Sequence, residues 1–381
     1  VQVLESVSQP FISDERSSSA METFRQMLNE CVRLGLAENK SSFMSLRYAC
    51  YPKLKDFKIA AAFKNNAISR ASGILSSYRK LVKKGRRVRK PYCWKPILTT
   101  SYQFKKTTNS IILPSKLEIP LNGYVLKKIK GKRIHSITVS ERGVSICFSK
   151  EVQPIECNEI FGIDTNLENI TLAGNGFTRR FDMTEIGVAK QRYREAKSHF
   201  NRNDHRVLSQ ISEKYGKLQA DKSQSEIHKT TARIVKLAKK SKAGIAIEDL
   251  KGIRKLYRKG NGQGGNFRAR LNSWAFGEFQ RQIEYKAKRE GLTVVKVAAR
   301  NSSAKCMACG NKLFPEEYRK LRCSKCGLII DRDENAAINV RTRGLAKLFA
   351  MRFSPIGLPS EAMNGNLTTR VILLANGSQS V

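Results

Sequence analysis

The chain has 381 residues and a formal net charge of +39, because 71 lysines and arginines outnumber 32 aspartates and glutamates. A charge of this size indicates a polyanionic partner. A hydrophobic content of 40% with 17 Phe and 11 Tyr can fill more than one core, which excludes a disordered basic tail and a single small domain. The sequence has no apolar run of the roughly 20 residues that a membrane span needs, and no signal-peptide pattern at Val1 to Phe11. Secretion and membrane insertion are therefore disfavoured.

The first predicted element is a helix from Ser18 to Leu36. A serine cluster that can cap a helix opens it, and apolar residues follow at helical spacing: Met21, Phe24, Met27, Leu28, Cys31 and Leu34. A second helical pattern runs from Phe57 to Lys84. These segments predict a helical block that packs against strands.

Basic residues dominate the next stretch. From Tyr78 to Arg133 there are 17 lysines and arginines and one acid, with aromatic residues between them. This mixture suits contact with phosphates together with stacking on bases or sugars. A solvated helix face explains a single run equally well, but a second run, Thr184 to Gly260, carries 20 bases and eight acids. The candidate nucleic-acid-binding residues are Lys83, Lys84, Arg86, Arg87, Arg89, Lys90, Lys127, Lys128 and Lys130.

Period-two patterns follow the basic run. Ser110 to Pro120 predicts extended structure. Ser136 to Ser140 and Val144 to Phe148 flank the turn Glu141-Arg142-Gly143 and predict a β-hairpin. An amino-terminal domain of strands with a helical block is the expected architecture.

The second half of the chain has the pattern of one α/β domain. Three strands form a predicted meander and two more follow helices, at 160–164, 169–173, 176–180, 245–248 and 292–297. The predicted helices span 190–219, 225–239 and about 268–290, and a last helix opens at Asp331 to Ala337. The Pro, Gly, Asn and Ser content after Gly344 predicts a disordered tail.

Acidic residues end several of these elements. Asp164 and Glu248 end two predicted strands, and Asp333 or Asp331 opens the last helix. Acids at the carboxyl ends of neighbouring strands can share one pocket, where their oxygens would select Mg²⁺ or Mn²⁺. Two such ions suit phosphodiester cleavage. For each acid alone, capping a helix or pairing with a base is the alternative, and Asp249 and Glu334 compete for the same roles.

Four of the nine cysteines form a pattern, and the other five are scattered singly, as buried thiols are in a reducing cytosol. Cys306, Cys309, Cys323 and Cys326 form two C-x2-C pairs separated by thirteen residues, which is the spacing of a four-thiolate zinc site. Four thiolates fill the tetrahedron of the ion and leave no position for water. The pattern therefore favours a structural zinc ribbon over a catalytic zinc.

Together these motifs resemble those of the TnpB family of transposon-encoded RNA-guided nucleases, which is related to the type V CRISPR nucleases. The residues that carry the resemblance are Gly162 to Leu167, Ile247 to Leu250, the paired C-x2-C motifs and Asp331 to Ala337, in the same order. The resemblance covers about Phe161 to Arg343. It implies an RNase H-like (RuvC) nuclease fold in which the zinc ribbon precedes the final helix.

The resemblance also implies site residues and domains. The catalytic acids, which would hold two Mg²⁺ or Mn²⁺ ions, fall on Asp164, Glu248 and Asp333, the last in preference to Asp331. The implied fold class is α/β plus α+β. A β-barrel-like wedge domain at 1–154 with a helical recognition insertion at about 18–85 precedes the RuvC domain at 155–343, with the zinc ribbon at 300–330 and the tail at 344–381.

The implied activity is RNA-guided, metal-dependent endonucleolytic hydrolysis of DNA in association with a transposable element. The implied partners are a guide RNA from the transposon end and double-stranded target DNA with a short flanking motif, and the implied location is the prokaryotic cytoplasm at the nucleoid. A nucleic-acid-binding regulator that does not cut is the alternative, and a strand-joining transposase is ranked last. All three acid positions are filled, which favours cleavage.

Two segments depart from the family pattern. The opening strand that the resemblance implies is not evident in Val1 to Phe11, so the amino terminus is interpreted as incomplete or divergent. An aromatic residue followed by Thr-Ser is expected before the first zinc cysteine, where this chain has Asn301-Ser302-Ser303.

Overall fold

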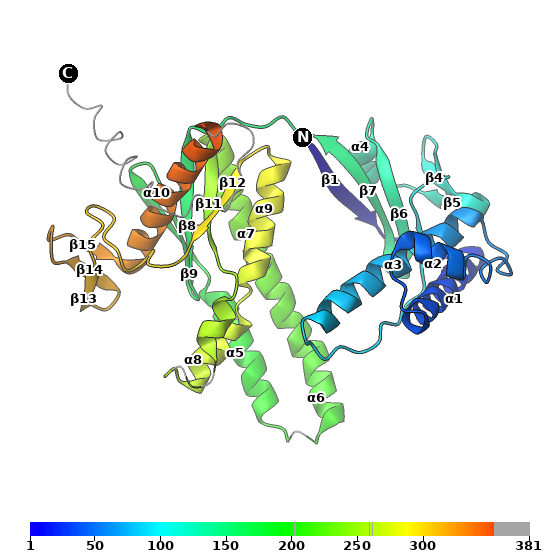
Figure 1. Cartoon of the computed structure of the whole chain (residues 1–381), viewed down its shortest axis with the longest axis horizontal. Coiled ribbons are helices and arrows are strands. Elements are labelled where there is room, and N and C mark those ends of the chain that lie inside the picture. Colours follow the sequence, from blue (N-terminus) through cyan, green and yellow to red (C-terminus); the bar gives the residue numbers. More distant parts are fainter. Residues whose placement is uncertain (202, 259, 261, 354–381) are drawn as a thin grey trace. The chain divides into compact units, whose positions relative to one another are not determined.

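The computed structural model describes residues 1–201, 203–258, 260 and 262–353. These residues divide into two compact units, Gln2–Glu151 and a second unit that begins at Val152 and includes Val1. Figure 1 traces both units along the chain. Each unit is described separately.

The strands of the first unit form two antiparallel sheets. The larger sheet has the order β1-β7-β6-β2, from β1 (Gln2–Gln9), β7 (Gly143–Glu151), β6 (Ile134–Ser140) and β2 (Ile97–Thr100). The smaller sheet is formed by β3 (Lys105–Lys106), β4 (Ser110–Leu113) and β5 (Leu117–Pro120), with the 3₁₀ turn η1 (Pro114–Lys116) between the last two. The predicted hairpin is confirmed as β6 and β7, which are joined by a tight turn.

Strand β1 is present at a place where the sequence pattern did not indicate a strand. Gln2–Gln9 is a strand that pairs with β7 along its whole length, from Gln2 with Glu151 to Gln9 with Val144. Its pattern is hard to recognise because its buried positions, Val3, Val7 and Gln9, include a polar residue. The Gln9 side chain bonds to the carbonyl oxygen of Pro120 at 2.7 Å and accepts from the Asn122 amide at 3.0 Å.

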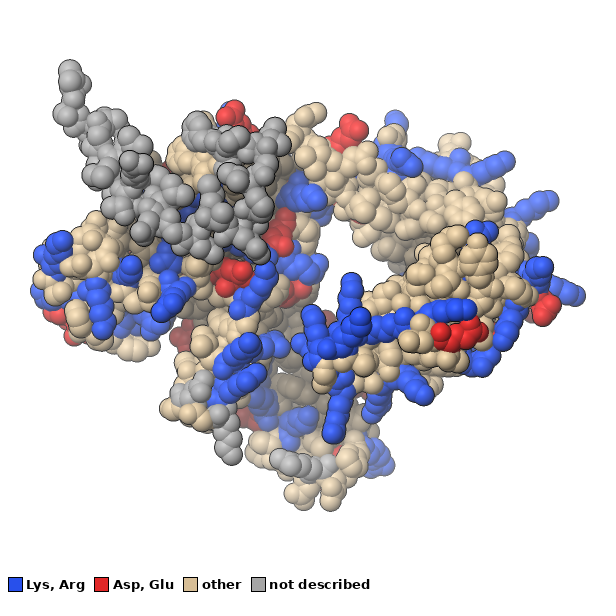
Figure 2. All heavy atoms as spheres, in the orientation of Figure 1, with Lys and Arg blue, Asp and Glu red and all other residues tan. Residues whose placement is uncertain are grey.

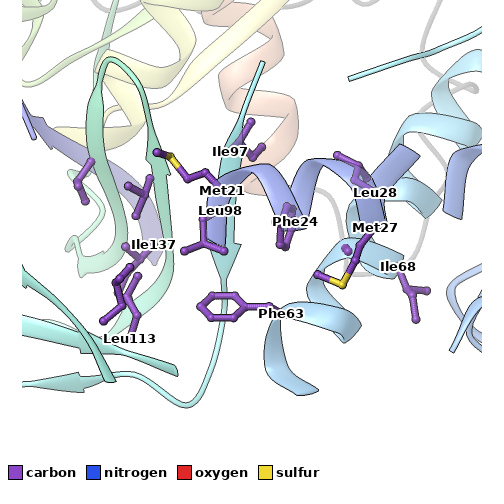
Figure 3. Packing of buried hydrophobic residues seen from close by; sticks show 14 of the residues in the cluster. Met21, Phe24, Met27, Leu28, Phe63, Ile68, Ile97, Leu98, Leu113 and Ile137 are labelled. Carbon is purple, nitrogen blue, oxygen red and sulfur yellow. The ribbon is translucent and has the colours of Figure 1, made fainter. Parts of the chain in front are cut away.

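The helices of the first unit lie mostly between β1 and β2 in the chain. They are α1 (Glu15–Ala37), α2 (Phe43–Cys50) and α3 (Ala61–Lys83), and α4 (Gly123–Ile129) follows β5. The cap of α1 is Asp14 rather than the predicted serine cluster, because its carboxylate accepts from the Ser17 amide at 2.8 Å. One hydrophobic core joins α1 and α3 to strands of both sheets (Figure 3): Met21, Phe24, Met27, Leu28, Phe63, Ile68, Ile97, Leu98, Leu113 and Ile137.

The second unit is built on a five-stranded sheet of order β10-β9-β8-β11-β12. The first three strands in the chain, β8 (Glu159–Thr165), β9 (Asn169–Gly174) and β10 (Phe177–Asp182), form the predicted antiparallel meander. Strand β11 (Ala243–Asp249) runs parallel to β8, and β12 (Val294–Ala298) runs parallel to β11. The carboxyl ends of β8, β11 and β12 therefore lie at one edge of the sheet.

Helices cover both faces of this sheet. On one face, α7 (Lys217–Lys240) and α9 (Phe276–Arg289) pack on alternate residues of the strands, among them Ile163 and Ile247. On the other face, α10 (Arg332–Phe353) packs through Val340 and Leu348 on Ile160 and Ala246. The continuous apolar runs of β8 and β11 reflect this burial on both faces.

The structure moves two helix boundaries. The predicted helix 190–219 is divided: α5 (Thr184–Ser198) ends before a turn, and α6 (His205–Ile211), a π-helical turn at Ser212–Gly216 and α7 follow one another directly. The amide of Asn201 bonds to the Asp204 carboxylate at 3.0 Å and stabilises the turn. The predicted helix 268–290 breaks between α8 (Gly265–Ser273) and α9 because Trp274 adopts an extended conformation and its indole bonds to the Leu167 carbonyl at 2.9 Å. A 3₁₀ turn, η3, spans Ile253–Tyr257.

The tail predicted from Gly344 was wrong for its first ten residues. Helix α10 continues to Phe353, and residues 354–381 lie outside the described part. Leu345 and Leu348 continue the apolar stripe of Val340 onto the sheet, which stabilises these turns. Gly344 lies so close to Ala246 and Ile160 that a side chain would not fit.

Helix α10 packs closely on β8 at Gly162, where a larger residue would lower stability. A methyl group on Gly162 of β8 would collide with backbone atoms of Ala337 and Arg341 on α10, which cannot rotate away. Gly162→Ala is therefore expected to lower the free energy of unfolding by roughly 3 kcal/mol or more. Gly187→Ala on α5 is the control, because a methyl there meets no atom, and it should leave stability equal or slightly higher. Urea denaturation of both variants measures the difference, and equal midpoints would show that α10 does not pack this tightly.

A small three-stranded sheet lies between β12 and α10 in the chain. It is formed by β13 (Leu313–Glu317), β14 (Lys320–Cys323) and β15 (Ile329–Asp331), all antiparallel. Its small core contains Cys306, Leu313 and Cys323. None of the described helices combines the length and the apolarity that crossing a bilayer requires.

Candidate functional site

Two of the predicted acids come from neighbouring parallel strands. Asp164 is near the end of β8 and Glu248 near the end of β11, and the preceding residues, Ile163 and Ile247, are paired in register. The two carboxyl groups therefore lie side by side at the carboxyl edge of the sheet. Asp164 is 7% exposed and Glu248 is 8% exposed.

The third acid reaches the same edge from α10. Asp333 is in the first turn of that helix and is 2% exposed. Asn169 of β9, the other neighbour of β8, donates Nδ2 to Asp333 Oδ2 at 3.1 Å and is itself held by the Thr171 hydroxyl at 3.1 Å. The structure thus brings Asp164, Glu248 and Asp333 to one place.

The electrostatics of Asp164 reflect this proximity. Burial, together with the charges of Glu248 and Asp333, raises the pKa of Asp164 to about 7, and the hydrogen bond from Asn166 Nδ2 at 2.6 Å opposes that shift. Burial also raises the pKa of Glu248, and a hydrogen bond from Ser302 opposes that shift. Asp164 and Glu248 are therefore two carboxylates whose ionised forms a cation would stabilise.

The alternative acids have other partners. Asp331 accepts from the amides of Asp333 at 2.8 Å and Glu334 at 3.3 Å and pairs with Arg180 at 2.8 Å, so it caps α10. Asp249, the half-buried last residue of β11, accepts from the amide of Lys251 at 3.2 Å. Glu334 accepts from the Thr178 hydroxyl. Within the described residues these three acids have structural contacts away from the cluster.

Ser302 and Arg319, which were not predicted as site residues, form hydrogen bonds to the acids. Ser302, buried at 6% exposure, donates its hydroxyl to Glu248 Oε1 at 2.6 Å. Arg319, in the turn between β13 and β14, donates to Asp333 Oδ2 at 2.6 Å from a backbone with φ +63°. Ser302 could be suspected from its place before the first zinc cysteine, whereas no sequence signal marks Arg319.

Two asparagines of α10 hold the loop that carries Ser302. Asn339 Nδ2 donates to the carbonyl oxygens of Ser302 and Lys305, both at 2.8 Å. Asn335 donates to Lys305 at 2.8 Å and accepts from the amide of Met307 at 3.0 Å. The helix that presents Asp333 therefore also positions the donor to Glu248 and the first cysteine turn.

The four cysteines come together as their spacing predicts. Their sulfur atoms all lie within 4.8 Å of one another, with Cys309 and Cys323 at 3.4 Å and Cys306 and Cys326 at 3.7 Å. Each C-x2-C pair is followed by a glycine with positive φ, Gly310 at +74° and Gly327 at +71°, whose amide bonds back to the first cysteine of its pair. Hydrogen bonds from the backbone amides of Cys326 and Lys325 lower the pKa of Cys323 to about 6. The four thiols fit one zinc ion, and this cluster could hold it.

In the part of the chain that the structure describes, this cysteine cluster is the one group of three or more metal-binding side chains with ligand atoms so close together. Among the described residues the three acids are not such a group, and Glu248 and Asp333 each accept a hydrogen bond from a protein donor. Their role as metal ligands therefore stays a prediction. Their oxygen donors nevertheless match the preference of Mg²⁺.

Burial of Asp164 predicts how stability depends on pH. Because folding raises its pKa from the ordinary 3.8 to about 7, the protonated form favours the native state, and this contribution is lost as the pH rises through 7. Above pH 7, Asp164→Asn should therefore unfold at a higher temperature than the parent chain and have a free energy of unfolding greater by up to about 4 kcal/mol, with no advantage below pH 4. Calorimetry in buffer without added divalent cations measures this, with Asp249→Asn, at the half-buried neighbouring acid, as control. A parent chain as stable as Asp164→Asn at pH 8 would contradict it.

All nine candidate nucleic-acid-binding residues are exposed. Lys83 ends α3, and Lys84, Arg86, Arg87, Arg89 and Lys90 lie in the connection from α3 to β2. Lys127, Lys128 and Lys130 lie in α4 or directly after it. Figure 2 shows lysine and arginine side chains, in blue, gathered over the end of α3. Exposure is consistent with a role in phosphate contact, which remains a prediction.

Comparisons with known proteins agree with the motifs. Residues 276–340 match the Cas12f1-like TNB domain family, and residues 20–113 match the uncharacterized protein MJ0013 family. The chain is 25% identical over 293 residues to the CRISPR-associated endodeoxyribonuclease Cas12f1 of an uncultured archaeon, which covers 70% of this chain and 50% of that protein. A cryo-EM structure of a Cas12f1-sgRNA-target DNA complex aligns with a TM-score of 0.49 at 16% identity, covering 87% of this chain and 83% of that one.

A further relative defines the family. The TnpB-like protein MJ0751 of Methanocaldococcus jannaschii is 33% identical over 217 residues, which are 55% of this chain and 77% of that protein. The aligned share of the relative is large, whereas the chain spans only half the length of the Cas12f1 protein. The chain therefore belongs to the TnpB-like protein family.

Proposed function

We propose that this protein is an RNA-guided DNA endonuclease that hydrolyses phosphodiester bonds of target DNA. The observation that carries the proposal is the cluster of Asp164, Glu248 and Asp333, which are buried and arrive from β8, β11 and α10. The chain has a net charge of +39, yet it buries three acids together. Such a group suits the binding of divalent cations, which in turn can bind a phosphate.

The sheet supports an RNase H-like assignment for the second unit. An antiparallel meander followed by two parallel strands gives the order β10-β9-β8-β11-β12, and α10 closes one face. We assign this unit as the RuvC domain, its cysteine cluster as the inserted zinc ribbon, and the first unit as the wedge domain with the recognition helices α1 to α3. The kinship with TnpB-like proteins and with Cas12f1, an endodeoxyribonuclease, supports these assignments.

In the proposed active site, Asp164, Glu248 and Asp333 hold two Mg²⁺ or Mn²⁺ ions. Bound divalent ions would supply an activated water and stabilise the leaving oxygen. The protein orients the carboxylates: Asn166 holds Asp164, Ser302 holds Glu248, and Asn169 holds Asp333. The guanidinium of Arg319 beside Asp333 can donate to a phosphate oxygen of the bound strand, where it would offset developing charge.

The proposed partners are a guide RNA from the transposon end and a double-stranded target with a short flanking motif. Pairing between guide and target would read the sequence, and the exposed lysines and arginines would contact phosphates of the heteroduplex.

The test uses the full chain purified with its bound RNA. Incubated with double-stranded DNA that matches the copurified RNA, it should give cleaved ends with Mg²⁺, and no product when Mg²⁺ is left out. Tight binding without product in both conditions would identify a regulator instead, and joined strands would identify a transposase. Sequencing the copurified RNA supplies the target for the assay.

Ser302 offers a second test of the site. Ser302→Ala leaves the buried Glu248 carboxylate without its 2.6 Å donor, which costs roughly 1–3 kcal/mol. We expect cleavage to slow about tenfold, because each 1.4 kcal/mol in the barrier is a factor of ten. Ser302→Thr keeps the hydroxyl and should restore most of the rate, and Ser303→Ala, at the less buried neighbour, controls for loop disturbance. A wild-type rate for Ser302→Ala would show that the contact does not position Glu248.

A further inference from the structure

Two large aromatic side chains are exposed in the connection between α3 and β2. Trp94 is 81% exposed and Tyr92 is 51% exposed, and both lie between the end of α3 at Lys83 and the start of β2 at Ile97. Their ring centroids lie 4.7 Å apart with an interplanar angle of 65°. Large aromatic groups held in water on an ordered surface indicate a binding site.

The segment is held to α1 by its backbone. Asn29 donates Nδ2 to the Cys93 carbonyl oxygen at 3.0 Å and accepts from the Cys93 amide at 2.8 Å. Arg25 donates to the Tyr92 hydroxyl at 3.1 Å, and the Cys93 side chain packs against the core. The two rings are therefore positioned before any partner arrives, which lowers the entropy lost on binding.

A cavity of 420 Å³ lies between this segment and α1, within the size range of small-ligand sites. Tyr92, Leu36 and Val32 give it apolar surface, and Gln26 and Glu30 give it polar groups. The cavity therefore offers apolar surface for a planar ring and hydrogen-bonding groups for the substituents of that ring.

The charge around the rings is positive. Nine bases and no acid occur from 79 to 95 in the sequence. The two nearby acids on α1 are paired, Glu22 with Arg25 at 2.5 Å and Glu30 with Arg33 at 2.6 Å. Interfaces between proteins are depleted of lysine, whereas aromatic rings within a basic groove are typical of single-stranded nucleic-acid sites.

We propose that Tyr92 and Trp94 form a stacking platform for an unpaired base of an RNA strand. The bases from Arg79 to Lys95 contact the flanking phosphates, and the side-chain amide of Gln26 bonds to the ribose 2′-hydroxyl, which distinguishes RNA from DNA. The choice of RNA rests on the proposed function, but the platform itself does not require cleavage.

Tryptophan fluorescence tests the platform directly. The chain has two tryptophans, and Trp274 is 4% exposed and packed on Phe276, so a quencher in solution reaches Trp94. The full chain, freed of RNA by high salt, is titrated with an unstructured oligouridylate and with the oligodeoxyuridylate of equal length. The RNA should quench the emission and protect Trp94 from acrylamide, and the DNA should do so at clearly higher concentration.

Variants separate stacking from charge. Tyr92→Ala and Trp94→Ala should each weaken RNA binding roughly five- to 150-fold in a filter-binding assay, the range for loss of one stacked base. Trp94→Phe keeps a ring and should bind within a few-fold of the parent chain. Tyr48→Ala, at an equally accessible tyrosine on α2 that is 77% exposed, is the control and should not change affinity.

Each outcome decides a part of the proposal. RNA that binds tightly without quenching, or with unchanged affinity for Trp94→Ala, overturns the platform. Equal affinity for RNA and DNA overturns the assignment to RNA. Because the assay measures binding alone, a chain that fails to cleave DNA but shows the expected quenching would refute the nuclease proposal and leave the platform standing.

Discussion

Alanine in place of Asp164 is expected to reduce DNA cleavage by roughly 10³-fold or more, since Asp164 in its proposed role as a ligand of the divalent ions would supply several kcal/mol of transition-state stabilisation. Asp164 lies on β8 beside Glu248 of the neighbouring strand β11, and the charges of Glu248 and Asp333 both act on it. The substitution removes one of the three carboxylates of the cluster. Binding of RNA and DNA should persist, because the exposed bases of the first unit are unaffected.

The measurement is single-turnover cleavage of a matched duplex at saturating Mg²⁺, with binding followed separately on the same samples. Asp249→Ala is the matched control, since this acid follows Glu248 in β11 but is half-buried, and its carboxylate contacts the amide and the ammonium group of Lys251. The control should cleave within a few-fold of the parent chain. Cleavage by Asp164→Ala at the parental rate would refute the assignment of the active site.

Loss of one zinc cysteine is expected to have the second large effect. Cys309→Ala should lower the zinc content from about one ion per chain to near zero, because a structural site contributes ~10–16 kcal/mol of apparent binding free energy in small zinc peptides. The core of the ribbon is small, with Cys306, Leu313 and Cys323 as its buried residues. Without zinc it should unfold, and Arg319 and Met307 would then lose their contacts with Asp333 and Asn335. Cleavage should fall by at least about tenfold.

Zinc content by atomic emission and cleavage on the same preparation test this expectation. Cys147→Ala is the control, because Cys147 lies on β7 of the first unit, is half-buried and is not part of the cluster. It should keep its zinc and its activity. Full cleavage by Cys309→Ala without zinc would show that the ribbon does not support the acids.

The sequence predicts those parts of the fold that depend on local pattern. The strands of the second unit are continuous apolar runs, and the cysteine spacing alone indicates the cluster. The positions of Asp164 and Glu248 follow from the parallel pairing of β8 and β11. Their convergence with Asp333 requires α10 to lie on β8, which Gly162 permits and which no local pattern indicates.

Other features depend on contacts between distant residues. Strand β1 is a strand because β7 pairs with it, and its buried Gln9 disguises the alternation. The break before α9 follows from a hydrogen bond between Trp274 and Leu167, which helix propensity cannot include. Arg319 reaches Asp333 from a left-handed turn position that arginine seldom occupies, so composition gives no sign of it.

The position of α10 in the chain has a consequence for synthesis. The helix supplies Asp333, covers one face of the sheet and holds the loop of Ser302, yet it is the last described element to leave the ribosome. A nascent chain that has reached β15 already has the basic surface of the first unit and two of the acids, but it lacks the third. The nascent chain therefore presents its basic surface before the acidic cluster is complete, and it gains the third acid only when its final helix folds onto the sheet.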